Sequence, residues 1–338
     1  MVPATLYTDI NLQLFATQTT LLNQTGNDLS PEMKTYYEKR LIDYAEPNLV
    51  HDQFGDAYPI PAHGGKTIEF RKYSPLDKAL TALTEGVTPS GNKLDVTTIE
   101  ATVDQYGDFI EISDVLELTA IDRNLEQATK LLGSQAGRTL DTVTRDIITA
   151  GTNVMYAPKA DGTEILTRAT VAADCLLTVD AIFKAAAKLR EMNAVPVDDS
   201  FVAIVHPNVA CDLMLSDKWM DVHKYATPEN IYRGEIGQIG GVRFVQTTEA
   251  KIFGPVGASG TSVYATMVIA ANAYGITDIN GGGLQHIVKQ LGSSGTADPL
   301  NQRATTGWKA MKVAERLVEE YMVRIEHACA TNPKAAAN

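Results

Sequence analysis

The acidic residues Asp104, Asp108, Glu111 and Asp114 are the first side chains in this sequence whose spacing suggests chemistry. Paired carboxylates can serve as general acid and general base in catalysis. These four, however, lie in a stretch that alternates apolar and polar residues, and strand side chains alternate between two faces. The favoured interpretation is therefore a solvated or inter-subunit face.

Two other patterns resemble incomplete ligand sites. His51, Asp52 and His63 could begin a metal site, but no further ligands follow at a spacing typical of zinc proteins. The glycines from Gly234 to Gly241 precede an expected strand, so they cannot place a phosphate at a helix N-terminus and instead favour a tight turn. We therefore predict neither a metal site nor a cofactor.

Catalytic machinery is not recognisable in the rest of the sequence. It contains no phosphate-binding loop, zinc-protease motif or nucleophile elbow. At the ends of two expected buried strands, only His206 and Asn272 offer reactive side chains, and nothing completes a catalytic pair. We therefore expect a protein that is not an enzyme.

Size, charge and cysteine content narrow the class of protein further. The 338 residues exceed the length that one hydrophobic core usually serves, which favours two domains. The net charge of −12 argues against a protein whose main task is binding nucleic acid. No apolar run is long enough for a membrane span, and we recognise no secretory signal. Cys175, Cys211 and Cys329 lie far apart, which favours free thiols in a reducing compartment.

A long two-stranded arm over residues 66–113 is the element around which we expect the chain to be organised. Strand-like runs at Thr67–Tyr73 and Ile99–Ile112 flank a polar loop with several prolines and glycines. Within the second run the apolar residues change parity past Tyr106–Gly107, which predicts a bulge near Gly107. Because two strands with one weakly apolar face are not stable alone, the rest of the chain or another subunit must cover the arm.

Before and after the arm, helices are predicted from caps and periodicity. Residues 1–29 favour a flexible or partner-dependent segment, and Ser30–Pro31 is a helix start. Apolar residues recur at helical spacing over 124–150, which predicts a helix about 40 Å long. Such a length suits a scaffold strut.

The second half of the chain has an α/β pattern from Thr178 onward. Continuous apolar runs predict buried strands at Phe201–Val205 and Val263–Ala270. The final stretch from Trp308 to Ala328 fits either a helix or strands broken near Glu319–Glu320, and periodicity does not decide between them.

Charged and apolar residues of the arm are the candidates for contact between subunits. Arg71 and Lys72 could pair with acids on a neighbour, a contact that favours register and specificity over affinity. The residues predicted at this interface are Arg71, Lys72, Leu76, Leu80, Leu83, Glu85, Val87, Lys93, Asp104 and Asp108.

Several stretches, taken in order, resemble one protein family. They are Pro47–Gly55, Gly65–Arg71, Leu83–Pro89, Gln105–Phe109, Gly234–Val245 and Gly307–Ala310. Over residues 30–328 the chain resembles the major capsid proteins of tailed bacteriophages with the HK97-type fold. One branch, the coat proteins of the phage N-four type, is especially similar.

The resemblance implies an α+β fold with a defined order of parts. These are an N-terminal arm at 1–65, an extended hairpin or E-loop at 66–113, a peripheral domain at 114–177 and 290–330 with a spine helix at 124–150, an axial domain at 178–289, and a tail at 331–338. It also implies that the ambiguous C-terminal stretch forms long strands.

The implied function is a major capsid protein whose hexamers and pentamers form an icosahedral shell around double-stranded DNA. The implied partners are other copies of the chain, a portal protein, scaffolding or decoration proteins, and weakly contacted DNA, with no membrane. The implied location is the virion, after assembly in the cytoplasm of a bacterial host. Two alternatives stay open: the shell of a cellular nanocompartment, which a cargo enzyme with a docking tail would reveal, and a soluble α/β enzyme built on residues 178–290.

Overall fold

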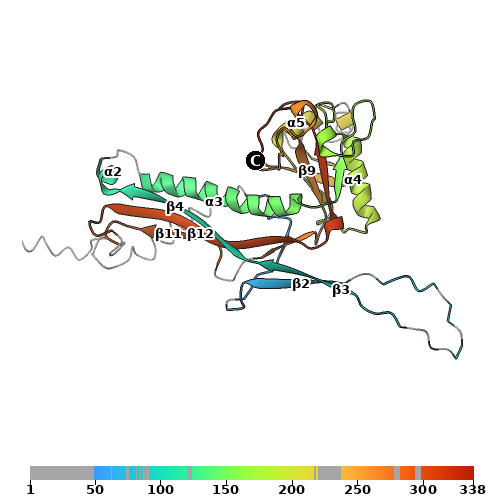
Figure 1. Cartoon of the computed structure of the whole chain (residues 1–338), viewed down its shortest axis with the longest axis horizontal. Coiled ribbons are helices and arrows are strands. Elements are labelled where there is room, and N and C mark those ends of the chain that lie inside the picture. The colour runs from blue at the N-terminus through green and yellow to red at the C-terminus, as the bar shows by residue number, and fades with distance from the viewer. Residues whose placement is uncertain are drawn as a thin grey trace, which may run out of the picture.

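The computed structural model describes residues 49–61, 63–73, 76–80, 82–83, 85–86, 88, 91–119, 124–216, 218–219, 237–277, 282–293 and 298–338. An elongated platform of one long helix on a sheet carries a compact α/β domain at one end, and a hairpin extends below that domain (Figure 1). This combination agrees with the predicted α+β class. The predicted N-terminal segment and the helix start at Ser30–Pro31 lie outside the described residues.

The platform consists of helix α3 (Asn124–Thr149) lying on a five-stranded sheet. Strands β1 (Asp56–Ala57), β10 (Tyr274–Thr277), β12 (Arg303–Arg316) and β11 (Gln285–Lys289) follow one another in that sheet, and β4 (Asp104–Ser113) also pairs with β12. The buried face of α3 carries Leu132, Ala136 and Leu140, which pack on Trp308 and Ala310. The helix predicted over 124–150 is therefore confirmed, and its apolar stripe faces β12.

The arm is shorter than the sequence indicates. Only β2 (Thr67–Tyr73) and β3 (Val96–Thr102) form the two-stranded hairpin. At Val103, whose N–H donates to the Lys66 carbonyl at 2.8 Å, the chain leaves the hairpin and enters the platform as β4. The return half predicted for the arm thus belongs largely to another sheet.

The predicted bulge near Gly107 is wrong. Strand β4 pairs with β12 without interruption from Asp104 to Ser113. The apolar parity changes because the partner strand changes at Val103, where pairing with β2 ends. Gly107 has a different role: a Cβ there would lie 2.6 Å from the Trp308 carbonyl oxygen, so close strand packing requires glycine.

The α/β domain is built on a six-stranded sheet. Its strands, in spatial order, are β5 (Val154–Tyr156), β13 (Met322–His327), β9 (Tyr264–Ile269), β6 (Phe201–Val205), β8 (Val242–Gln246) and β7 (Gln238–Ile239). Helices α4 (Val179–Glu191) and α5 (Pro207–Met214) pack on one face, and every residue of β6, β9 and β13 is buried. Thr178 caps α4 by accepting from the Ala181 N–H at 3.3 Å. The predicted buried strands are confirmed.

The C-terminal stretch forms strands, as the resemblance implies. Strand β12 ends at Arg316, a short 3-10 turn η6 (Glu319–Tyr321) follows, and β13 then enters the α/β sheet beside β9. Conversely, β10 and β11, which the sequence places with the axial domain, pair with β12 in the platform. The chain therefore passes between the two halves at different residues from those predicted.

Short elements complete the described residues: α2 (Asp114–Thr119) and the 3-10 turns η3 (Arg168–Thr170) and η4 (Ala258–Gly260). In the described ranges no helix is both long enough and apolar enough to cross a membrane.

Candidate assembly interface

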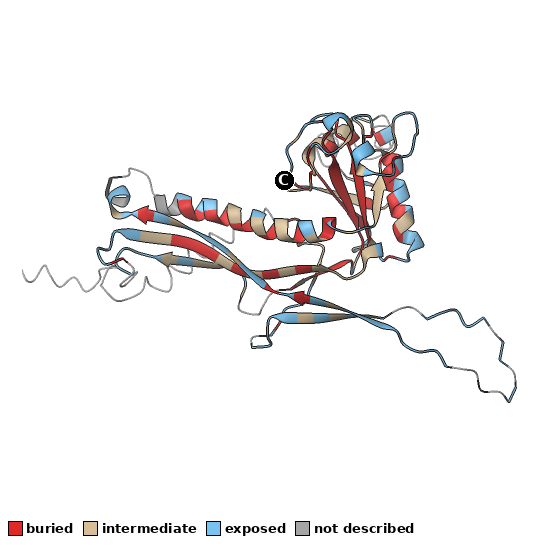
Figure 2. Ribbon diagram, in the orientation of Figure 1, coloured by how far each residue is buried: buried red, intermediate tan, exposed pale blue. Residues whose placement is uncertain are grey.

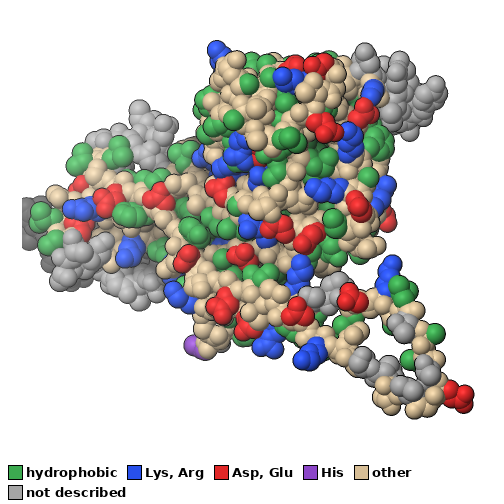
Figure 3. All heavy atoms as spheres, turned by 45° about the vertical axis from the view of Figure 1, so that its right-hand side comes forward, with side chains coloured by type: hydrophobic (Ala, Val, Ile, Leu, Met, Phe, Trp, Pro, Cys, Tyr) green, Lys and Arg blue, Asp and Glu red, His purple; other side chains and the backbone are tan. Residues whose placement is uncertain are grey.

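The hairpin presents apolar side chains that its own chain leaves uncovered. Ile68 and Phe70 of β2 and Ile99 of β3 are only half-buried, although Ala101 is buried. Phe70 packs edge-on against Tyr58 with ring centroids 5.2 Å apart. Beyond the strands, Leu76, Leu80, Leu83 and Leu94 are 57–86% exposed. Figure 2 shows the whole hairpin as predominantly exposed, and Figure 3 shows hydrophobic and charged side chains along the loop that stands away from the body. Exposed apolar groups gathered in this way indicate a docking surface.

The charged residues predicted at the interface form contacts inside the chain. Arg71 pairs with Glu69 of its own strand at 3.1 Å. The Lys72 ammonium lies 3.3 Å from Glu320 of η6 and so joins the hairpin to the body. Both pairs are substantially exposed, so each contributes about 0–1 kcal/mol.

The remaining predicted residues divide between the tip and the platform. Glu85 and Lys93 are exposed in the same loop as Leu76, Leu80, Leu83 and Leu94, which we call the tip leucines. Val87 lies outside the described residues. Asp104 and Asp108 lie on β4, at a distance from the tip along the chain. Gln135 of α3 donates to Asp108 at 2.6 Å, and this hydrogen bond, with one from a backbone N–H, lowers the pKa of that carboxyl. The structure therefore does not bring the predicted residues into one cluster.

A second apolar surface lies on the platform, where sequence reasoning missed it. Strand register places Phe109, Gly307 and Ile287 in one row across three strands. Because the neighbouring Trp308 faces α3, this row lies on the opposite face of the sheet. Phe109 is 60% exposed and Ile287 39% exposed. The sequence carried one sign of this surface: Phe109 alternates with Ile110 and Ile112 along the strand and so must lie on the opposite face of the sheet.

Glycine is required in the middle of that row. A Cβ on Gly307 would lie 2.7 Å from the Phe109 Cβ and 2.8 Å from the Asp108 carbonyl oxygen. Gly307 thus lets β4 lie close beside β12 while the Phe109 side chain stays exposed. The same end of the platform carries further exposed apolar residues: Val115, Leu116, Leu291 and Leu300.

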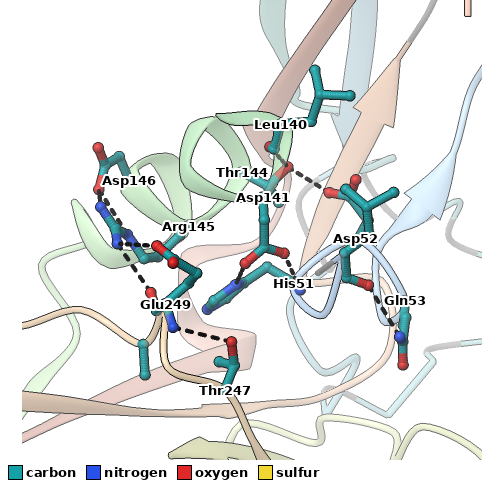
Figure 4. A network of polar contacts seen from close by, with 12 residues as sticks. His51, Asp52, Gln53, Leu140, Asp141, Thr144, Arg145, Asp146, Thr247 and Glu249 are labelled. Atoms are coloured by element: carbon teal, nitrogen blue, oxygen red, sulfur yellow. Dashed lines mark hydrogen bonds and ion pairs between the residues drawn. The ribbon is translucent and has the colours of Figure 1, made fainter. Parts of the chain in front are cut away.

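A buried polar network binds the segment that contains His51 and Asp52, where the chain enters the platform, to α3 (Figure 4). The His51 backbone N–H donates to Asp141 Oδ1 at 2.8 Å, and the His51 ring Nδ1 lies 2.7 Å from Oδ2. Asp52 accepts from the Thr144 hydroxyl at 2.6 Å and also binds the Lys312 ammonium. His51 and Asp52 therefore bind groups of the chain itself instead of beginning a metal site.

The tyrosine hydroxyl beside this network is also engaged. Tyr274 donates to the His51 carbonyl, and burial, followed by nearby carboxylates, raises its pKa well above the usual range. No group of three metal-binding side chains occurs among the residues that the structure describes.

A second buried cluster lies where α3 meets the α/β domain. The fully buried Glu326 carboxylate accepts from Arg168 at 2.6 and 2.8 Å and from Arg324 at 2.8 Å. Arg324 also donates to the Gly151 carbonyl at 2.9 Å, just beyond the end of α3. These ion pairs connect β13 with η3 and with the end of α3.

Comparison with known proteins identifies one family and several solved structures of similar fold. The family model described as phage capsid protein matches residues 96–321. No curated protein sequence matches the chain.

Solved structures of similar fold include several phage capsids. The capsid of the cyanophage P-SCSP1u is 15% identical, with 83% of this chain and 88% of that chain covered at a TM-score of 0.64. The capsid of Ralstonia phage GP4 is 14% identical over 78% and 84%, with a TM-score of 0.62. The capsid of cyanophage Pam1 is 15% identical over 98% and 100%, with a TM-score of 0.60.

Proposed function

This chain belongs to the phage capsid protein family, and from that premise we propose that its copies build their shell through hexamers and pentamers around double-stranded DNA. The chain is a major capsid protein of a tailed phage, a subunit of an icosahedral shell with the HK97-type fold. Its role is structural, and it needs no catalytic group or cofactor for that role.

The observation that carries the assembly proposal is the pair of apolar surfaces at opposite ends of one chain. The tip leucines extend past the α/β domain, whereas Phe109 and Ile287 lie on the platform toward α2 (Figure 1). The two surfaces lie at opposite ends of the molecule, so they meet only between copies. Such a contact is heterologous, and heterologous contacts that close produce rings.

In this arrangement the hairpin is the E-loop of the subunit and lies on a neighbouring platform. Burying Leu80 and Leu83 there would contribute about 1.5–3 kcal/mol for each fully covered side chain. Because every subunit gives one hairpin and receives one, modest contacts multiply across the lattice. The platform would correspond to the peripheral domain and the α/β unit to the axial domain, with its glycine-containing loops around the symmetry axes.

The acidic balance of the chain supports weak contact with packaged DNA. With a net charge of −12, most of the surface repels phosphates, which favours packaging and release. A portal protein, and scaffolding or decoration proteins, complete the proposed set of partners. Assembly would take place in the cytoplasm of the bacterial host, and the product is the virion shell.

Deletion of residues 74–95 tests the role of the hairpin. We expect the shortened subunit to remain folded, with circular dichroism like that of the full chain, and to form no shells under conditions in which the full chain does. Normal shells from the shortened chain would rule out the hairpin as the clamp between copies.

A further inference from the structure

Residues 330–338 form an extended strap that is bound along the α/β domain. At its start, Asp212 Oδ1 accepts from the Thr331 hydroxyl at 2.6 Å and from the Thr331 backbone N–H at 3.2 Å. In its middle, the Ser262 N–H donates to the Pro333 carbonyl at 2.8 Å. The strap is therefore fixed to the α/β domain over most of its length.

The far end of the strap binds residues 247–252, which we call the joint loop and which form the first part of the connection from β8 to β9. Asn338 Oδ1 accepts from the Ile252 N–H at 2.9 Å, and Asn338 Nδ2 donates to the Ala250 carbonyl at 2.8 Å. One amide side chain thus satisfies both a donor and an acceptor of the loop, as a neighbouring strand would.

The joint loop in turn binds the last turns of α3. Arg145, only 2% exposed, donates to the Glu249 carbonyl at 3.0 Å, and the two side chains approach each other in Figure 4. Lys251 Nζ donates to Asp146 Oδ1 at 3.0 Å and to the Asn338 carbonyl at 2.9 Å. Lys251 therefore connects the strap to the platform helix through a single ammonium group.

The packing between the halves is incomplete at the same place. A small cavity is lined by Ile148, Gly151, Met267, Met322 and Arg324, among others, between the end of α3 and the α/β sheet. Side chains around a void lose dispersion contacts on one side, so polar contacts, including that of Arg324 with the Gly151 carbonyl, help to hold this junction. The polar contacts of the joint loop consequently matter for the angle between the two halves.

We propose that the strap is a latch that fixes the α/β domain relative to α3, with Lys251 as its positioning residue. When the strap is seated, Asn338 holds the joint loop and provides one of the two acceptors that orient the Lys251 ammonium toward Asp146. When the strap is released, that acceptor is lost, and the loop is held to the helix by Arg145 and by a Lys251 side chain that is less restrained.

The latch has a consequence for assembly that rests on the proposed function. One chain that occupies positions around both five-fold and six-fold axes must adopt slightly different angles between its halves. A seated strap narrows the range of those angles, so its strength sets how uniform the curvature of the shell is.

The test compares Lys251→Met and Asn338→Ala in the full, unassembled chain by hydrogen–deuterium exchange. Lys251→Met removes both contacts of the ammonium, and Asn338→Ala removes the side-chain amide that holds the strap to the joint loop. Because the strap must stay seated for its backbone carbonyl to orient Lys251, we expect exchange in residues 143–152 to rise at least about fivefold in either variant, with no change in the β6 core. The double variant should exchange no faster than the faster single variant. Lys251→Arg should retain wild-type exchange, because the guanidinium also donates to both acceptors.

Lys218→Met is the matched control, since it removes an exposed ion pair with Asp180 inside the α/β domain. Faster exchange confined to the strap and the joint loop, or fully additive effects of the two changes, would overturn the latch. In assembled material, the two variants should give a broader distribution of shell diameters by electron microscopy. Unchanged diameters despite faster exchange would overturn only the link to curvature, because exchange is measured before assembly.

Discussion

Asp141 of α3 binds His51 twice, through the backbone N–H at 2.8 Å and through the ring Nδ1 at 2.7 Å, and both side chains are excluded from solvent. The pair joins the segment that enters the platform to the middle of the helix. Because 90 residues separate the partners, the contact fixes tertiary structure and not local helix geometry.

Replacing Asp141 by alanine should therefore destabilise the subunit. The change leaves two buried groups of His51 without a partner, which we expect to cost on the order of 3 kcal/mol. Urea unfolding of the unassembled chain measures the loss. Asp199→Asn, an exposed position, should change the free energy of unfolding by less than about 0.5 kcal/mol; equal effects at both sites would contradict the assignment.

The tip leucines should affect assembly without affecting folding. A Leu80→Ser/Leu83→Ser variant loses apolar area that is exposed in the free subunit and, on our account, buried between copies. Its melting temperature should equal that of the wild type, and its critical concentration for assembly should rise at least about tenfold.

Leu166→Ser provides the control for the tip variant, because Leu166 is 81% exposed but lies in the α/β domain. We expect it to assemble as the wild type does. A melting temperature that falls in the tip variant alone would show that the hairpin packs against its own chain.

Glycine at position 307 should be needed for folding of the platform. In Gly307→Ala the new methyl group meets the Phe109 Cβ and a backbone oxygen, so strands must shift at a cost of about 1–3 kcal/mol. At Gly283 a Cβ meets nothing within 4 Å, and Gly283→Ala should be nearly neutral. We expect thermal unfolding to separate the two variants, and similar melting temperatures would refute the close approach of β4 to β12 at Gly307.

Much of the fold could be predicted because local signals were strong. The apolar stripe over 124–150, the cap at Thr178 and the run Phe201–Val205 each specify their element almost alone. The strand pairing around Val103 could not be predicted, since a change of partner strand and a bulge both reverse the apolar parity. The break near Glu319–Glu320 was visible, but only the resemblance decided between helix and strands.

The interface was predictable only in part. Exposed leucines in the tip follow from a hairpin with too little apolar surface to be buried by itself. The platform row depends on register among three strands that are distant in sequence, and no local pattern specifies that register. Asp108 was assigned to the interface from its charge, whereas its side chain accepts a hydrogen bond from Gln135 of α3 in the same chain.

His327 should make stability depend on pH between about 4 and 6.5. Its ring is fully buried, so the protonated form is disfavoured, and burial lowers the pKa of His327 from 6.5 to about 4. The unfolded chain therefore binds more protons in this window, so the contribution of His327 is complete above pH 6.5 and is lost as pH falls toward 4. The ring lies 2.9 Å from the Thr266 hydroxyl and 2.8 Å from the Ala328 carbonyl, contacts that suit a neutral imidazole.

Unfolding free energies measured from pH 4 to pH 7 test this contribution. The wild type should lose about 3 kcal/mol more than His327→Gln over that range. His63→Gln, at an exposed site, should follow the wild-type curve. Parallel curves for wild type and His327→Gln would contradict the assignment.

Cryo-electron microscopy of particles assembled from the purified chain, checked by sedimentation, tests the central claim most directly. The account predicts closed shells in which each hairpin lies on a neighbouring copy, with Leu80 and Leu83 buried against the platform row of Phe109 and Ile287. A compact monomer under all assembly conditions, or shells in which the hairpin tip contacts no other copy, would contradict it.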